Sequence, residues 1–243
     1  MSSPLARIPA PARGIALLVP LVALTVAGCT GSEETTTEGK SAEDVLAGAK
    51  EALDATSGVR ISMSTDEDPG GDYLSDASGV ITADPAAFEG TISGRVSGFP
   101  GEGIGVVSVD GTVYIDVPLV GWTDEYEPAD FCAPDPATLL DPETGVSSVL
   151  TEATEVEEGE AERDQDDAEV VITPYTGTVP GEAIRSILPC TEGEDVDATF
   201  AVDDDGKLRS ADITGAFFPD TEPVTYRISI EEYDATADIS APE

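Results

Sequence analysis

The apolar residues that follow position 40 are spaced first as in a helix and then as in a strand. Between residues 41 and 53 they recur three to four positions apart, and Ser41 followed by Asp44 resembles a capping box. This pattern predicts an amphipathic helix that ends near Gly58. Across residues 59–64 apolar and polar side chains alternate strictly, which is typical of a strand with one buried face.

Most of the remaining chain carries strand patterns. The predicted strands are 77–83, 86–98, 104–109, 112–117, 154–156, 170–172, 196–202, 208–217 and 224–233. Asp110-Gly111 is a strong hairpin signal between two of them, and short helical patterns occur only near 146–150 and 180–188. A run of antiparallel strands with few helices predicts an α+β domain.

The strand predicted at 86–98 alternates large apolar side chains with glycine on one face. Its other face is polar. The apolar face carries Phe88, Gly90, Ile92, Gly94, Val96 and Gly98. Glycine weakens a strand unless the sheet bends sharply or another group approaches closely. These glycines therefore either let a long strand coil around a packed helix or leave an apolar groove for an extended guest, and both interpretations stay open.

Further apolar positions would line such a groove if it exists. They are Ile61, Met63, Val80, Val113, Ile115, Leu150, Ile187, Ile213, Phe217, Tyr226 and Ile228. Residues of this kind belong more often to a packed core than to a binding site, because cavities borrow core-facing positions. The face that each strand turns inward is not fixed by the pattern.

The first 28 residues have the order of a secretory signal. Arg7 and Arg13 precede an uncharged, mostly aliphatic stretch that is interrupted by Pro20 and is too short for a comfortable transmembrane helix. Residues 26–29 (Val-Ala-Gly-Cys) resemble the bacterial lipobox, in which a peptidase cuts before the cysteine and lipid is attached to it. We expect a signal peptide at 1–28 and lipidation of Cys29; the alternative is an ordinary cleaved signal with a chance cysteine.

The residues after Cys29 suit a tether followed by one domain. Residues 30–40 hold no large apolar side chain, so 29–40 is expected to be a flexible spacer and 41–243 the folded domain. The chain has 50 acidic and 11 basic residues, a net charge of −39. This charge excludes nucleic acid as a partner and repels anionic lipid headgroups, so a membrane role has to come from the anchor. Acid-rich surfaces are also typical of salt-adapted proteomes.

Two cysteines remain after Cys29. An even number of cysteines in an exported chain favours a disulfide, here between Cys132 and Cys190. A zinc site is the weaker alternative because the chain contains no histidine. We expect no cofactor and no metal. Calcium could bind the acid-rich stretch 155–169, but a solvated loop is favoured there, and a tight hairpin is favoured at 203–207.

The residue inventory argues against catalysis. Without histidine no Ser-His-Asp or Cys-His arrangement is possible. No Gly-x-Ser-x-Gly elbow or phosphate-binding glycine loop occurs, and the many carboxylates lie mostly in predicted loops without the aromatic platforms of a glycosidase site. We therefore expect a protein that is not an enzyme.

Several segments in a fixed order resemble a known family. They are the lipobox at Cys29, the helix at 41–53 leading to the strand at 59–64, the hairpin at 109–114, the segment 140–150 and the closing strand at 226–234. No single one is diagnostic, but together they cover nearly all of the chain after residue 28. In order and spacing they resemble the actinobacterial lipoproteins of the LppX/LprG/LprA/LprF type.

The resemblance implies a fold and a function. The fold would be a strongly bent antiparallel sheet, a half-barrel like that of the Lol lipoprotein carriers, with helices packed on its concave face around an apolar cavity. The function would be that of a lipoprotein anchored at the outer face of the cell membrane, which binds the acyl chains of lipids or lipoglycans and carries them within the envelope. An envelope transporter or assembly protein is a possible partner.

The candidate lipid-binding residues then come from the groove described above. They are Ile61, Met63, Val80, Phe88, Gly90, Ile92, Gly94, Val96, Val113, Ile115, Leu150, Ile187, Phe217 and Ile228. The segment 140–150 is the candidate gate for entry of the acyl chain. Two alternatives remain: a scaffold or assembly lipoprotein that has a filled core and binds a protein partner, and an acidic calcium-binding surface protein.

Overall fold

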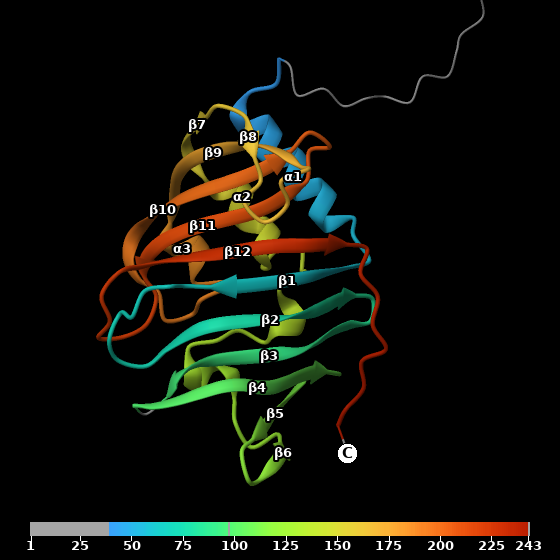
Figure 1. The fold of residues 1–243 in the computed structure, drawn as a ribbon, viewed down its shortest axis with the longest axis vertical. Coiled ribbons are helices and arrows are strands. Elements are labelled where there is room, and N and C mark those ends of the chain that lie inside the picture. The colour runs from blue at the N-terminus through green and yellow to red at the C-terminus, as the bar shows by residue number, and fades with distance from the viewer. Residues whose placement is uncertain (1–38, 97, 243) are drawn as a thin grey trace, which may run out of the picture. The chain divides into compact units, whose positions relative to one another are not determined.

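Residues 39–96 and 98–242 are described in this computed structural model, except for the side chain of Glu194. The predicted signal peptide, Cys29 and most of the predicted spacer lie outside the described residues. The described residues form one compact unit. Its framework is a single antiparallel sheet with few helices (Figure 1).

The strands follow the alternating patterns of the sequence. They are β1 (Gly58–Ser64), β2 (Tyr73–Ala83), β3 (Ala86–Val96), β4 (Phe99–Val109), β5 (Thr112–Val117), β6 (Gly121–Thr123), β7 (Thr154–Glu158), β8 (Glu162–Arg163), β9 (Val171–Pro180), β10 (Glu192–Asp203), β11 (Leu208–Ala216) and β12 (Val224–Tyr233). Short β6 and β8 carry too few residues to show a period and were not expected. Gly98 lies in the β3–β4 turn, with a positive φ of 77°, rather than in the predicted strand.

The sheet is open and curved, and its two halves meet at its first and last strands. The order is β6-β5-β4-β3-β2-β1-β12-β11-β10-β9-β7, and β8 also pairs with β9. Thus β1 lies between β2 and β12, and this pairing joins the half β1–β6 to the half β7–β12 (Figure 1). The sequence prediction of an α+β domain built on an antiparallel sheet is confirmed.

Local signals account for the first helix and for two turns. In α1 (Ala42–Asp54), the Ser41 hydroxyl accepts a hydrogen bond from the Asp44 amide at 3.2 Å and the Asp44 carboxylate accepts one from the Ser41 amide, which is a complete capping box. Asp110 and Gly111 both have positive φ, as a two-residue type I′ hairpin requires. The carboxylate of Asp203 accepts hydrogen bonds from the amides of Asp205 and Lys207, so 203–207 is the expected tight hairpin.

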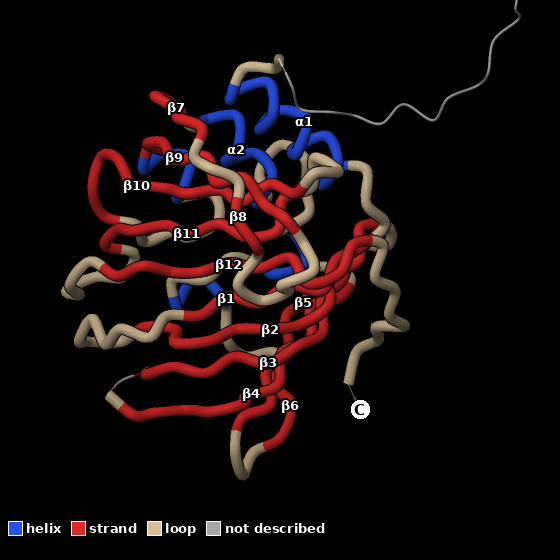
Figure 2. Tube along the Cα trace, turned by 45° about the horizontal axis from the view of Figure 1, so that its top comes forward, coloured by secondary structure: helices blue, strands red, loops and turns tan. Residues whose placement is uncertain are grey.

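The other helices are short and irregular. They are the α-helical turns α2 (Val149–Glu152) and α3 (Gly181–Ile184) and the 3-10 turns η1 (Pro128–Phe131), η2 (Pro136–Thr138) and η3 (Val146–Ser148). α1 packs against α2, η3, β7 and β11, and α3 packs against β9 and β10, so the α-helices gather on the β7–β12 half (Figure 2). The β1–β6 half is covered by η2, which contacts β2, β3 and β4.

The β7–β12 half has a filled interior. Leu46 and Leu53 of α1 pack there with Phe200, Phe217 and Tyr226, all of them almost completely buried. The rings of Phe217 and Tyr226 lie 5.5 Å apart in a tilted arrangement that aromatic pairs favour. Large side chains and α1 together fill the interior of this half, which we call the solid half.

The glycines of β3 have close neighbours. Gly90 pairs with Gly79 of β2, and the Phe88 ring lies over both, so that an added β-carbon at either residue would fall 2.5 Å from a ring atom. At Gly94 an added β-carbon would meet the Tyr73 carbonyl at 2.3 Å, beside an irregularity in the β2–β3 register. Of the two interpretations left open for these glycines, the open groove does not hold at Gly90 and Gly94, because a ring and a bulged backbone occupy that space.

Replacing Gly90 tests this close approach. Gly90→Val would place its β-carbon 2.1 Å from the Ser78 carbonyl oxygen, and we expect overpacking to lower the free energy of unfolding by about 1–3 kcal/mol, measured by urea denaturation. Gly48→Ala in α1 is the control, because an added β-carbon there has no neighbour within 4 Å. It should raise stability by about 0.5–1 kcal/mol. A Gly90→Val protein as stable as the parent would contradict the packing described.

Candidate functional site

An apolar pocket of about 500 Å³ lies inside the β1–β6 half of the sheet. Its floor consists of side chains from β1 to β5 and from β12. Apart from Ser62, Ser78 and Tyr126, its lining side chains carry no polar group. The floor residues are Ile61, Met63, Leu74, Ala77, Phe88, Ile92, Val96, Ile104, Val106, Val113, Ile115 and Ile228.

Strand register explains why these side chains share one face. Met63 lies opposite Ala77 of β2 and Ile228 of β12, and Ile92 of β3 lies opposite both Ala77 and Ile104. Directly opposed residues in antiparallel strands project to the same face. The alternation seen in the sequence therefore continues across six strands as one apolar surface.

A proline-rich segment forms the roof of the pocket. We call residues 117–139 the roof segment; it includes β6, η1 and η2. Its lining residues are Val117, Pro118, Tyr126, Pro128, Phe131, Ala133, Pro134, Pro136 and Leu139, and further cover comes from Val146, Ile187 and Leu188. Proline lacks an amide hydrogen, so a proline-rich segment can cross an apolar surface with fewer backbone groups in need of partners.

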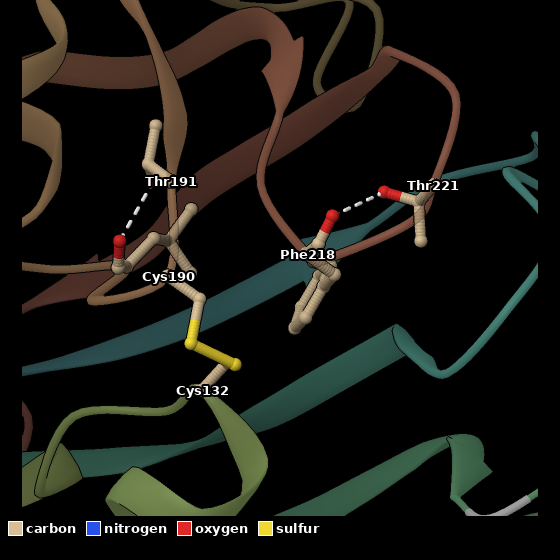
Figure 3. Close-up of a disulfide and its surroundings, with 6 residues drawn as sticks. Cys132, Cys190, Thr191, Phe218 and Thr221 are labelled. Carbon is tan, nitrogen blue, oxygen red and sulfur yellow. Dashed lines mark hydrogen bonds between the residues drawn. A yellow bond between two sulfur atoms is a disulfide. The ribbon is translucent and has the colours of Figure 1, made fainter.

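A disulfide fastens the roof segment to the opposite wall. Cys132 and Cys190 are bonded across a sequence separation of 58 residues, which confirms the sequence prediction (Figure 3). Phe131 and Ala133 on one side, and Ile187 and Leu188 on the other, line the pocket. The Thr191 hydroxyl, next to Cys190, donates a hydrogen bond to the Leu188 carbonyl at 2.7 Å. The bond thus joins two segments that both close the pocket.

Comparison with known proteins agrees with this architecture. A family model described as LppX_LprAFG lipoprotein matches residues 41–239. The chain belongs to this family. The resemblance drawn from the sequence is thereby confirmed. No curated protein sequence matches the chain.

Two solved structures share the fold of this LppX_LprAFG lipoprotein. LprF from Mycobacterium bovis is 14% identical with a TM-score of 0.66, and the match covers 83% of this chain and 96% of LprF. The lipoprotein LppX from Mycobacterium tuberculosis is 15% identical with a TM-score of 0.58, covering 82% of this chain and 100% of LppX. At these identities the likeness concerns the fold alone.

The structure brings nine of the candidate lipid-binding residues to the pocket. They are Ile61, Met63, Phe88, Ile92, Val96, Val113, Ile115, Ile187 and Ile228. Five others lie elsewhere. Besides Gly90 and Gly94, these are Val80, which is in register with Arg60 and Glu89 on the outer face, and Leu150 and Phe217.

Leu150 and Phe217 were misplaced because core and pocket share one sequence pattern. Both are almost completely buried in the solid half of the interior, as are Ile213 and Tyr226. None of the residues of α1, α2 and α3, all of them described, lines the pocket. The regular helices of this family member therefore fill one half of the interior and leave the other half to the roof segment.

Segment 140–150, the candidate gate, is tied to α1. The Lys50 ammonium donates to the Pro142 carbonyl at 2.6 Å and forms an ion pair with Asp54 at 2.8 Å. Asp54 in turn accepts a hydrogen bond from the Ser147 hydroxyl at 2.5 Å. These bonds fix segment 140–150 to α1.

Charged groups stand outside the pocket. At its edge Arg95 forms a two-pronged ion pair with Asp68 at 3.0 Å and lies over the Tyr73 ring; the guanidinium lowers the pKa of the Asp68 carboxyl. In the solid half, burial raises the pKa of Tyr226, whose hydroxyl donates to the Leu74 carbonyl. At neutral pH the Asp68 carboxyl is therefore negatively charged and the Tyr226 hydroxyl is neutral.

The acid-rich insertion folds against the sheet as a loop between short strands. The Asp164 carboxylate accepts hydrogen bonds from the amides of Asp166 and Asp167 at 2.7 and 3.2 Å. Within residues 39–96 and 98–242, no group of three or more Asp, Glu, Cys or His side chains is placed to hold a metal ion. In the same part of the chain, no helix is long and apolar enough to cross a membrane.

Removing the disulfide tests its role in holding the roof segment. We expect Cys132→Ser/Cys190→Ser to lose about 4 kcal/mol of unfolding free energy, because the unfolded chain is no longer closed into a loop. Urea denaturation of the oxidised parent and the variant measures the difference. The parent treated with reductant is the control and should fall to the variant's stability. Equal midpoints for oxidised parent and variant would show that the bond does not constrain the chain.

Proposed function

We propose that this lipoprotein binds the acyl chains of lipids or lipoglycans in the apolar pocket and carries them within the cell envelope. The observation that carries the proposal is the pocket itself: about 500 Å³ of space lined by apolar side chains that do not fill it. This volume falls within the range of about 300–1,000 Å³ of small-molecule sites. A filled interior would instead favour the scaffold alternative.

The chemistry of the lining selects for hydrocarbon. No lining residue is an acid, a lysine or an arginine, so the pocket offers no charge to a polar ligand. Each methylene that leaves water contributes about 0.8 kcal/mol, so a long acyl chain supplies ample binding free energy through contact alone. The headgroup would stay at the pocket mouth, outside the apolar lining.

Binding on this proposal is passive and requires the roof segment to move. The floor is fixed by strand pairing over its whole length, whereas residues 124–139 contain only 3-10 turns and irregular backbone. The disulfide at Cys132 holds the middle of the roof segment, so opening would occur nearer β6. The curved sheet and its cover would thus act as a half-barrel that opens at one end.

We also propose that the protein is not an enzyme and that lipid on Cys29 holds it at the outer face of the cell membrane. The chain has no histidine, and the pocket offers only hydroxyl groups as reactive side chains. The signal-like first 28 residues and the polar spacer support export and tethering. A transporter or assembly partner fits this setting as a source or receiver of the lipid.

Solvent extraction of the purified protein followed by mass spectrometry tests the proposal. Noncovalent acyl lipid should be released, whereas lipid joined to Cys29 stays with the protein. Ala77→Phe projects a ring into the pocket from the middle of its floor and should reduce the recovered lipid several-fold. Ala161→Phe, at an exposed loop position of the acid-rich insertion, is the matched control. Parent protein that is repeatedly empty would overturn the proposal.

A further inference from the structure

We propose that the β5–β6 hairpin tip, residues 117–122, inserts into the surface of an uncharged lipid bilayer and holds the pocket mouth against it. This inference rests on the proposed function, because it supplies the route by which an acyl chain passes between bilayer and pocket. The occupant is a bilayer of zwitterionic lipid.

The tip exposes large aliphatic side chains in an otherwise acidic molecule. Leu119 is fully exposed and Val120 is 74% exposed. Residues 117–123 carry no charge, although the chain has 50 acidic residues. Exposed apolar side chains that gather at one place, rather than singly, mark an interaction surface.

The backbone conformation of the turn does not favour leucine at position 119. Val120 donates its amide hydrogen to the Val117 carbonyl at 3.0 Å, with Pro118 second in the turn and Leu119 third, at φ 71°. This is the pattern of a type II turn, whose third position favours glycine or asparagine because of its positive φ. The sequence places a bulky apolar residue at the position where it fits the backbone poorly and is most exposed. A contact outside the chain accounts for that choice.

Two aromatic rings lie just behind the aliphatic tip. Trp122 is partly exposed and lies over Gly105, where an added β-carbon would fall 2.8 Å from its ring. Tyr126 is partly exposed and lines the pocket, and the centre of its ring lies 5.8 Å from the centre of the Phe131 ring. Tryptophan and tyrosine favour the headgroup level of a bilayer, with aliphatic residues deeper. Along the chain, the aliphatic Leu119 and Val120 are followed by these two aromatic residues.

The tip is continuous with the pocket mouth. Val117 and Pro118 line the pocket, and Leu119 follows them directly. The β3–β4 turn lies at the same end of the antiparallel strands, and it adds the exposed Phe99 and the half-exposed Val96, which also lines the pocket. Each of these two hairpins thus carries exposed apolar side chains next to a residue that lines the pocket.

The net charge of the chain determines which lipid headgroups the tip can approach. A chain with a net charge of −39 is repelled by anionic headgroups, so the tip is suited to an uncharged surface. The tip also lies at the end of the long axis opposite to the start of α1 (Figure 1). Contact at the tip is therefore distinct from tethering ahead of α1, and the test has to read out the tip itself.

Trp122 provides this readout because it is the only tryptophan in the chain. The exported full-length protein is reconstituted into phosphatidylcholine vesicles with brominated acyl chains, which quench tryptophan on contact. We expect loss of most Trp122 emission in the parent. Leu119→Asn/Val120→Thr should restore the emission without lowering the melting temperature, because asparagine suits the positive φ of the turn. Ala161→Asn/Ala168→Thr, at exposed positions in the acid-rich insertion, is the matched control and should stay quenched.

A second variant separates tip insertion from lipid held in the pocket. Ala77→Phe fills the pocket and should leave Trp122 quenched. Quenching that disappears in Ala77→Phe, or that never occurs in the parent, overturns the docking proposal and leaves the extraction result to decide the proposed function. Quenching of the parent and of Ala77→Phe together with a parent that yields no extractable lipid would uphold docking and refute the carrier.

Discussion

The pairing of β1 with β12 determines the interior of this protein. It joins two half-sheets into one curved surface whose apolar inner face is longer than the helices can cover. α1 and its neighbours fill the space over β7–β12, where Phe200, Phe217 and Tyr226 are buried. Over β1–β5 the same apolar face continues, covered by the short 3-10 turn η2 instead of by α1, α2 or α3, and the free space of about 500 Å³ lies there.

The roof segment is held in place by different interactions from those that hold the sheet. Strand pairing holds the floor, but the roof segment is held by the Cys132–Cys190 bond and by contacts of η2 with β2, β3 and β4. The disulfide holds the roof segment near its middle, and at its start β6 pairs with β5 through three residue pairs. A floor fixed by strand pairing and a roof of short 3-10 turns would suit the proposed binding of an acyl chain, because the guest enters only if one wall yields.

Local signals made much of the fold predictable. The capping box at Ser41, the Asp110-Gly111 turn and the cysteine parity each depend on nearby residues or on simple counting, and each is confirmed. The pocket was only partly predictable. Ile61 and Ile92 reach it whereas Phe217 does not, because a period of two shows which residues face inward but not whether that interior is filled.

Hydrophobic periodicity in the sequence could not reveal two features of the structure. The roof segment is irregular, and its prolines indicated only the absence of regular structure, although Pro118, Pro128, Pro134 and Pro136 all face the pocket. The Phe88 ring covers Gly90 through a side-chain conformation that the strand pattern does not specify. The roof segment depends on tertiary contacts between segments far apart in the chain, whereas the position of the Phe88 ring is a side-chain conformation within one strand.

The pocket is an apolar space that the protein's own side chains do not fill. Affinity measured for a series of fatty acids of increasing chain length tests this most directly. The account predicts that Kd falls roughly fourfold with each added methylene, which corresponds to about 0.8 kcal/mol, until the chain fills the pocket. A Kd that does not change with chain length would contradict it.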